Sequence, residues 1–312
     1  MGEGFGYGKV ILFGEHFVVY GLPAIASAIG SKTTATVIRV KESGWHLEDE
    51  RPEVPGYKKE KADQQRVSIN NILKLAAVPL DHQGVKIRLG GDLVCASGIG
   101  ASAASCAALA RALSDEFSLG WDDEKVNEVA YEGEKGYHGT PSGIDNTAAT
   151  FGGLIWFLKN PQGGPSIFRK MKLREPTDLV IADTGITADT AEVVADVRRR
   201  REEDPLRFEQ ILAEYKELVT DAEEALNGLD LKRVGLLMNA NHELLREIGV
   251  SCGEVEELVA LAREEGALGA KLTGTGRGGN IIALTPGKKL REKAVNALKE
   301  KGVNVWTTQI GV

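Results

Sequence analysis

The order of apolar and polar positions in the first third of the chain is typical of β-strands. β-branched runs and strict alternation predict strands at 9–13, 24–29, 33–40 and across Val85, Ile87 and Leu89. Residues 41–66 are charged and contain two prolines, so we expect an exposed excursion there. From 67 to 77 the apolar positions recur at helical spacing, and Pro79 ends this predicted helix.

After residue 100 helical periodicity dominates. Helices are predicted at 101–113, from Asp122 or Asp123 to about 134, and at 190–201, 206–226, 230–248, 253–265 and 287–301. Shorter apolar runs predict strands at 154–158, 167–173, 179–182, 270–272, 280–284 and 303–308. Because the predicted strands come mostly first in the chain and the predicted helices mostly later, the pattern favours an α+β fold over strict βαβ alternation. The Pro- and Gly-rich break at 160–165 divides the chain into two predicted domains, 1–165 and 166–312.

Composition and charge exclude several classes of protein. With 312 residues, 42% of them hydrophobic, the chain can bury a full core, which excludes disorder as its main state. The formal net charge of −7 argues against nucleic acid or an anionic membrane as a partner, but local groups can still bind a small anion. The three cysteines lie far apart, and the histidines show no zinc spacing. We therefore expect a reduced, cytoplasmic protein.

The glycine-rich segment 96–104 is the most informative motif. It leaves a predicted strand and enters a predicted helix, so free backbone N–H groups at the helix start would form an anion site. Ser102 would lie in the first turn, within reach of a metal ion or phosphate. Two other interpretations stay open. The segment can be a tight turn of small packing residues, and Gly98, Gly100 and Ala103 also fit the GxGxxA pattern of dinucleotide-binding folds.

Two further segments are candidates for phosphate chemistry. Residues 274–279 match GxGxxG but precede a predicted strand, so a loop between strands is expected to present backbone amides there. In segment 134–146, Glu134 ends a helical pattern and Asp145 follows a Pro/Gly-rich loop. Two carboxylates near a phosphate loop suit Mg²⁺-assisted phosphoryl transfer, in which one binds the ion and the other accepts the alcohol proton. The alternative is that Ser142 or Asp145 only caps a helix.

Four segments together resemble one family. Segments 9–21, 98–104, 141–146 and 271–274 recur in this order in the GHMP kinases, and the Gly-Glu-His and Glu134–Asp145 segments resemble its compact, archaeal-type mevalonate-phosphorylating branch. The resemblance covers essentially the whole chain. It implies a two-domain α+β fold, with 1–165 as the ATP-binding domain and the active site in the interdomain cleft. It also implies ATP-dependent phosphorylation of the C5 hydroxyl of mevalonate.

The resemblance also assigns roles to individual residues. It implies that Asp145 is the catalytic base, with Lys9 beside it to stabilise developing charge, and that Ser102 and Glu134 bind Mg²⁺. The residues implied to bind the nucleotide are Val94, Ala96, Ser97, Gly98, Ile99, Gly100, Ala101, Ser102 and Ala103. The residues implied to contact mevalonate are Glu15, His16 and, more weakly, Thr190. The expected cofactors are ATP and Mg²⁺, and the expected assembly is a homodimer that binds neither nucleic acid nor membrane.

The chain departs from the family pattern at several positions. Ala101 replaces the first of two serines in the phosphate loop, and Tyr7 stands where a proline is usual. In the C-terminal glycine loop Thr275, Arg277 and Asn280 replace the usual small residues and cysteine. We expect that Arg277 either reaches the nucleotide phosphates or substrate carboxylate, or points into solvent.

Three functional hypotheses follow from the sequence. The first is phosphorylation of mevalonate. The second is another small-molecule kinase of the same family, acting on phosphomevalonate, galactose or homoserine. The third is a family member without catalytic activity that binds ATP, although the presence of Lys9, Ser102, Glu134 and Asp145 argues against it.

Overall fold

The computed structural model describes residues 1–81, 83–96, 98–160, 162 and 166–312. By its contacts the chain forms two compact units, one of Met1–Lys9 with Ala28–Gly152 and one of Val10–Ser27 with Gly153–Val312. This division differs from the predicted one at residue 165 because the first part of strand β2 (Ala24–Val40) pairs with strand β5 (Leu154–Leu158). The boundary between the two family domains at 165 stays a prediction.

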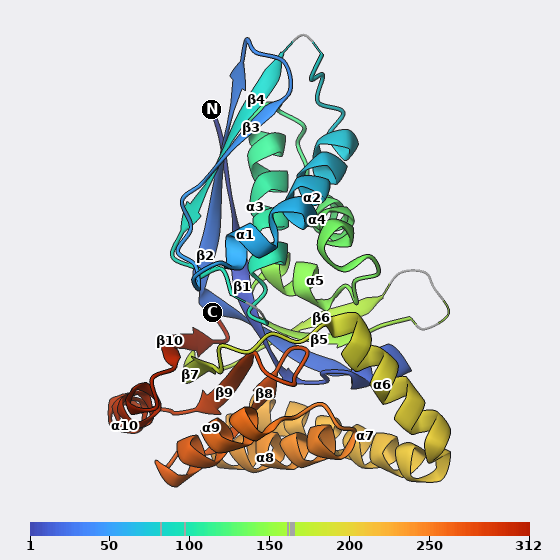
Figure 1. Cartoon of the computed structure of the whole chain (residues 1–312), viewed down its shortest axis with the longest axis vertical. Helices are drawn as coiled ribbons and strands as arrows, with labels where there is room; N and C mark the ends of the chain where they lie inside the picture. The colour runs from blue at the N-terminus through green and yellow to red at the C-terminus, as the bar shows by residue number, and fades with distance from the viewer. Residues whose placement is uncertain (82, 97, 161, 163–165) are drawn as a thin grey trace. The chain divides into compact units, whose positions relative to one another are not determined.

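The first unit is a sheet with helices. Its strands are β4 (Gly84–Gly91), β3 (Trp45–Asp49) and the parts of β1 (Gly2–Phe13) and β2 that lie within it. Strand β4 pairs with β2 antiparallel and with β3 parallel. Its helices are α1 (Tyr57–Glu60), α2 (Ala62–Leu75), α3 (Ala101–Glu116), α4 (Asp123–His138) and α5 (Ile144–Phe151). Figure 1 shows α3 next to these strands, with α2 and α4 packed beyond it.

The start of β1 packs unusually closely on α3. Glycines occupy every second position from 2 to 8, and a Cβ at Gly2, Gly4 or Gly6 would lie 2.2–2.3 Å from a backbone oxygen of α3. The oxygens belong to residues 112, 108 and 104, one turn of helix apart, and all three are alanines. Because glycine weakens isolated strands, the sequence pattern predicted a strand only from residue 9. The glycines are present because the helix backbone leaves no room for a side chain.

The second unit contains another sheet and the long helices. Strands β10 (Asn304–Ile310), β7 (Thr177–Asp183), β9 (Asn280–Leu284) and β8 (Gly269–Thr273) pair antiparallel in that order, and β5 pairs with β6 (Ile167–Met171). The helices are η1 (Phe17–Tyr20), α6 (Thr190–Glu203), α7 (Pro205–Gly228), α8 (Leu231–Glu247), α9 (Gly253–Glu264) and α10 (Lys288–Glu300). Helices α7 and α8 pack against each other, α8 packs on β8, and α9 packs on β8 and β9 (Figure 1).

Most predicted elements are confirmed, and the α+β fold class is confirmed. Two details were wrong, and one helix, α5, was not predicted. The two strands predicted at 24–29 and 33–40 form the single strand β2. The supposed excursion at 41–66 contains β3, α1 and the start of α2, and the loop before Asp145 leads directly into α5. The antiparallel pairing of β2 and β4 also excludes the dinucleotide-binding alternative, which needs a parallel sheet.

Within the described ranges, no helix is both long enough and apolar enough to cross a bilayer.

Candidate active site

Lys9 and Asp145 form an ion pair in the first unit. Lys9 Nζ lies 3.1 Å from Asp145 Oδ1, and it also donates a hydrogen bond of 3.4 Å to the carbonyl oxygen of Gly98. The Lys9 side chain is 3% exposed, whereas that of Asp145 is 27% exposed. The carboxylate therefore has access to a ligand, while the cation beside it is shielded from water. Gly143, with φ of +92°, precedes α5 and places Asp145 in its first turn.

Glu134 lies close to this pair. It belongs to α4 and is fully buried. Burial and the nearby charge of Asp145 raise the pKa of Glu134 to about 8, while a hydrogen bond with Ser102 and the charge of Lys9 oppose the rise. Its Oε2 has no hydrogen-bond partner among the described residues. Such a carboxylate would gain a partner and lose its repulsion from Asp145 if a cation were bound.

These donors fit Mg²⁺ in particular. Among the residues that the structure describes, no group of three or more His, Cys, Asp or Glu side chains could hold a metal ion. Mg²⁺ commonly binds one or two carboxylates together with substrate phosphates and water, rather than a complete protein cage. Glu134 Oε2 accepts no hydrogen bond among the described residues and lies 3.8 Å from His138 Nε2. This buried carboxylate and the hydroxyl of Ser102 therefore suit an ion that arrives with a nucleotide.

The predicted phosphate loop leads into α3. Gly98 and Gly100 have φ of +82° and +74°, values that favour glycine, and a Cβ at Gly100 would lie 2.6 Å from Lys9 Cγ. The amide of Lys9 donates to the carbonyl oxygen of Ile99, which fixes the loop to β1. Ser102 is the second residue of α3, so the free N–H groups of the first turn accompany it. Ala96, Ala101 and Ala103 are buried and Val94 is half-buried, whereas Ser97 lies outside the described residues.

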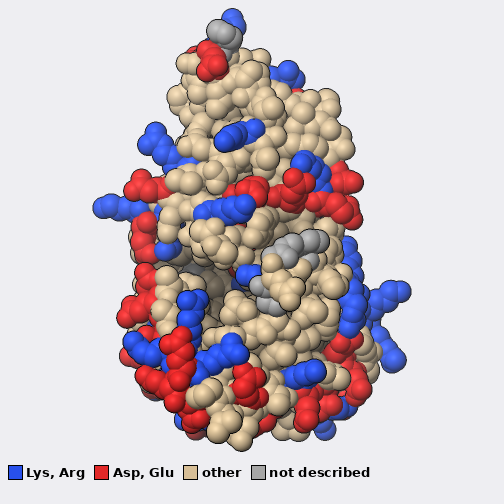
Figure 2. Space-filling model, turned by 90° about the vertical axis from the view of Figure 1, so that its right-hand side faces the viewer, with Lys and Arg blue, Asp and Glu red and all other residues tan. Residues whose placement is uncertain are grey.

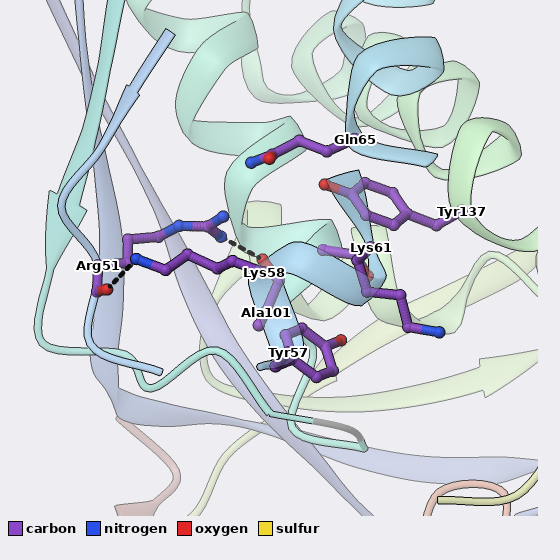
Figure 3. Close-up of a pocket in the computed structure, with 8 residues that line it drawn as sticks. Arg51, Tyr57, Lys58, Lys61, Gln65, Ala101 and Tyr137 are labelled. Atoms are coloured by element: carbon purple, nitrogen blue, oxygen red, sulfur yellow. Dashed lines mark hydrogen bonds between the residues drawn. The ribbon is translucent and has the colours of Figure 1, made fainter. Parts of the chain in front are cut away.

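A small cavity of about 10 Å³, room for roughly one water molecule, lies beside this helix start. Figure 3 shows its lining, which places basic side chains and two tyrosines around Ala101. The lining residues are Arg51, Tyr57, Lys58, Lys61, Gln65, Ala101, Ser102 and Tyr137. Burial raises the pKa of both tyrosine hydroxyls, so they are neutral and can donate hydrogen bonds. The lining thus supplies local positive charge in a chain whose net charge is negative.

Arg51 in this lining was missed by the sequence reasoning. It is 5% exposed, and its guanidinium pairs with Asp49 and donates to the Ala101 carbonyl oxygen at 3.3 Å and to Ser105 Oγ at 2.5 Å. It therefore ties the β3–α1 connection to the first turn of α3. A charged stretch with prolines predicts exposure, and no local pattern could show that Asp49 pairs with the arginine.

Figure 2 shows acidic and basic side chains interspersed over the face that it presents. No large area of that face carries a single sign of charge. The face shown in Figure 2 therefore has no broad positively charged surface.

The candidate substrate residues all belong to the second unit. His16, with φ of +61°, lies with Nε2 2.7 Å from the carbonyl oxygen of Thr275. Because a carbonyl only accepts, Nε2 carries the proton. Burial lowers the pKa of His16, the Thr275 contact opposes this, and the charge of Arg277 adds to it. The ring is therefore neutral near pH 7, and its Nδ1 is an acceptor. Thr190 Oγ1 lies 2.9 Å from Thr275 Oγ1.

Glu15 has a buried partner that the sequence did not reveal. Its carboxylate forms an ion pair with Lys271 of β8, and both side chains are 0% exposed. Lys271 also donates to the carbonyl oxygen of Leu272 at 2.7 Å. Segment 271–274 was recognised as one of the four family segments and as part of a predicted strand, but no role was assigned to the Lys271 side chain. Because its carboxylate is engaged in this pair, Glu15 is placed to fix the segment that carries His16.

Arg277 does not point into solvent, so that alternative was wrong. Its guanidinium pairs with Asp196 of α6 at 2.6 Å and donates through Nε to the carbonyl oxygen of Gly249 at 3.0 Å. An arginine in this loop thus has protein partners at both edges of its guanidinium.

Comparison with known proteins defines the class. The family GHMP kinases N terminal domain matches residues 68–153, and GHMP kinases C terminal matches residues 222–304. The chain belongs to the GHMP kinase family, whose members are ATP-using kinases, and the resemblance inferred from its motifs is confirmed.

Within that family, mevalonate kinases of nearly equal length are among the similar proteins. That of Pyrococcus furiosus is 35% identical over 97% of this chain and 94% of its own. That of Pyrococcus horikoshii is 36% identical over 94% and 91%. The crystal structure of L. major mevalonate kinase in complex with R-mevalonate matches with a TM-score of 0.94 and 45% identity, covering 99% of this chain and 96% of that one.

Proposed function

We propose that this protein transfers the γ-phosphate of ATP to the C5 hydroxyl of mevalonate. The observation that carries the proposal is the pairing of the buried Lys9 with the accessible carboxylate of Asp145 at 3.1 Å, next to Glu134. This arrangement occurs in a chain similar to mevalonate kinases over nearly its whole length. A carboxylate that can accept a proton, beside a cation that can stabilise an oxyanion, suits attack by an alcohol.

The proposed reaction is an in-line displacement. The C5 oxygen attacks the γ-phosphorus and forms the new O–P bond, while the bond from that phosphorus to the β,γ-bridging oxygen breaks and ADP leaves. The hydroxyl proton passes to the carboxylate of Asp145. Because an alcohol is a weak acid, Asp145 orients the hydroxyl first and accepts the proton late. Lys9 holds Asp145 in position and offsets the charge on the transferring group.

Ser102 and Glu134 are the residues we propose to hold Mg²⁺, which would neutralise phosphate charge when bound. The buried Oε2 of Glu134, which accepts no hydrogen bond among the described residues, supports this assignment. The first-turn N–H groups of α3 and the loop of Gly98–Gly100 would bind phosphate oxygens. Removing the metal with a chelator should abolish turnover, and added Mg²⁺ should restore it.

For the acceptor, we propose that neutral His16 accepts a hydrogen bond at Nδ1 from a mevalonate hydroxyl. The contact of Nε2 with the Thr275 carbonyl supports this, because it fixes the tautomer and the ring plane. Thr190 offers a hydroxyl next to the same threonine. The expected contact between Glu15 and mevalonate stays a prediction, and the buried pair with Lys271 indicates that Glu15 also acts through His16.

The test of this function is a coupled ADP-release assay with Mg·ATP and four acceptors in parallel: mevalonate, phosphomevalonate, galactose and homoserine. The proposal expects turnover with mevalonate at a kcat/KM at least a hundredfold above the others. Turnover only with another acceptor would replace the substrate and keep the kinase chemistry. ATP binding without turnover on any acceptor would favour the non-catalytic alternative.

Two wider expectations belong to the same proposal. The homodimer is an expectation from the family, and sedimentation of the purified chain measures it. The cytoplasmic location is an expectation from cysteine usage, and all three cysteines are free in the structure. Fractionation of the source cells measures it.

A further inference from the structure

The glycine-rich loop 274–279 is held by Arg277 at three points. The Arg277 amide donates to the carbonyl oxygen of Val250 at 2.8 Å, and its Nε donates to that of Gly249 at 3.0 Å. Its Nη1 lies 2.6 Å from Asp196 Oδ2 on α6, and the two side chains are 28% and 20% exposed. The loop is thus attached both to the α8–α9 connection and to α6.

The backbone of Arg277 is strained. Its φ of +51° lies in the left-handed region, where glycine is favoured and an arginine is uncommon. The neighbouring Gly276 and Gly278 also have positive φ, so the whole loop follows a path suited to glycine. An arginine is maintained on such a path when its contacts compensate for the strain. Here the compensating contacts are those of its guanidinium.

The same loop joins the candidate substrate residues. Two residues before Arg277, the Thr275 carbonyl accepts from His16 and its hydroxyl contacts that of Thr190. Thr190 is the first residue of α6, and Asp196 lies six residues further along that helix. The loop and α6 are therefore joined twice, by the Thr275–Thr190 contact and by the Arg277–Asp196 pair. Two points of attachment fix the orientation of the loop on the helix, whereas a single point would let the loop rotate about it.

We propose that Arg277, through Asp196, is a positioning residue that fixes loop 274–279 on α6 and so holds His16 and Thr190 ready for the acceptor substrate. The inference rests on the proposed function, because it assigns the role within mevalonate binding. Since Asp196 and Gly249 engage the guanidinium, Arg277 acts through the loop rather than as the group that binds the substrate carboxylate. Fixing these groups before binding reduces the entropy lost when the substrate binds.

The experiment compares Arg277→Gln and Asp196→Asn with Arg199→Gln. Arg199 is the matched control because it also pairs with Asp196, at 2.5 Å, but belongs to α6 and forms no ion pair with the loop in the described part of the chain. Amide hydrogen exchange is measured over 274–279 without substrate, and KM and kcat are measured with mevalonate and with ATP. Arg277→Lys, which keeps the charge without the planar donor set, should recover only part of any loss.

The proposal expects faster exchange in the loop and a higher KM for mevalonate in both test variants, each by roughly threefold to tenfold, as for loss of a partly exposed ion pair. The kcat, the KM for ATP and the control variant should stay within twofold of wild type. Both substitutions break the Arg277–Asp196 pair, and the Arg199 control measures the other pair that Asp196→Asn removes. The double variant should therefore resemble either single variant.

Unchanged exchange in Arg277→Gln, or faster exchange with an unchanged KM for mevalonate, would overturn the proposal. An equal effect of Arg199→Gln would also overturn it, because the effect would then belong to α6 alone. The exchange measurement needs no substrate. If the wild-type chain fails to turn over mevalonate while exchange responds as expected, the failure lies in the proposed substrate and not in the attachment of the loop.

Discussion

Replacing Asp145 by asparagine tests the assignment of the base directly. The substitution keeps the shape of the side chain but removes the group that accepts the proton and the partner of Lys9 Nζ, 3.1 Å away. Loss of a positioned base lowers turnover by about 10²- to 10⁴-fold, or roughly 3–5.5 kcal/mol of transition-state stabilisation. The KM for ATP should change little, because the proposed phosphate contacts come from the α3 loop.

The substitution has a second effect on stability. Removing one partner of a fully buried pair costs about 3–5 kcal/mol, but Asp145 is 27% exposed, so solvent screening reduces this to about 1–3 kcal/mol. For a chain of this size, that loss should lower Tm by only several degrees. The variant should therefore be folded at assay temperature, and its loss of turnover is chemical.

The assay is steady-state ADP release with saturating mevalonate and Mg·ATP, beside a thermal melt of each protein. Asp123→Asn is the matched control, since Asp123 pairs with Arg111 at 2.5 Å in the same unit and at an exposed position. The control should keep wild-type kcat. An Asp145→Asn variant with kcat within threefold of wild type would refute the role of Asp145 as base.

Three other perturbations have defined outcomes. Ser102→Ala should raise the Mg²⁺ concentration needed for half-maximal turnover, and an unchanged metal titration would contradict its role as a ligand. Burial raises the pKa of Glu134 to about 8, so the folded state keeps a proton that the unfolded chain releases above about pH 4.5. Without metal, stability should therefore fall between about pH 5 and 8, by at most about 4–5 kcal/mol, and melts of Glu134→Gln should lack this fall. Gly6→Ala should destabilise the fold by about 1–3 kcal/mol, because its Cβ would lie 2.2 Å from the Ala104 oxygen; an unchanged denaturation midpoint would contradict this.

Periodicity and local motifs predicted most of the fold. Long amphipathic helices such as α7 and α8 carry a strong signal, because one face must be apolar over many turns. The start of β1 was missed because it carries no such signal. Its glycines allow close packing against α3, and they do not form the apolar–polar alternation that predicts a strand. The local sequence of a strand carries no information about the helix against which that strand packs.

The candidate site was predicted unevenly. The motifs identified Lys9 and Asp145, and the structure places the two side chains in contact. The ion pairs that support the site could not be predicted, because each joins residues from different segments. Lys271 and Glu15 are separated by 256 positions, and Arg277 and Asp196 by 81. A charged residue in a sequence is expected at the surface, and only its partner shows why it is buried.

The central claim is that this chain phosphorylates mevalonate at C5. Phosphorus NMR of the wild-type protein incubated with mevalonate and Mg·ATP tests it most directly, because the spectrum identifies the product as well as its amount. The account predicts a phosphomonoester resonance, coupled to the C5 protons, that grows in step with ADP. ATP consumption without that resonance, or no consumption while ATP is bound, would contradict it.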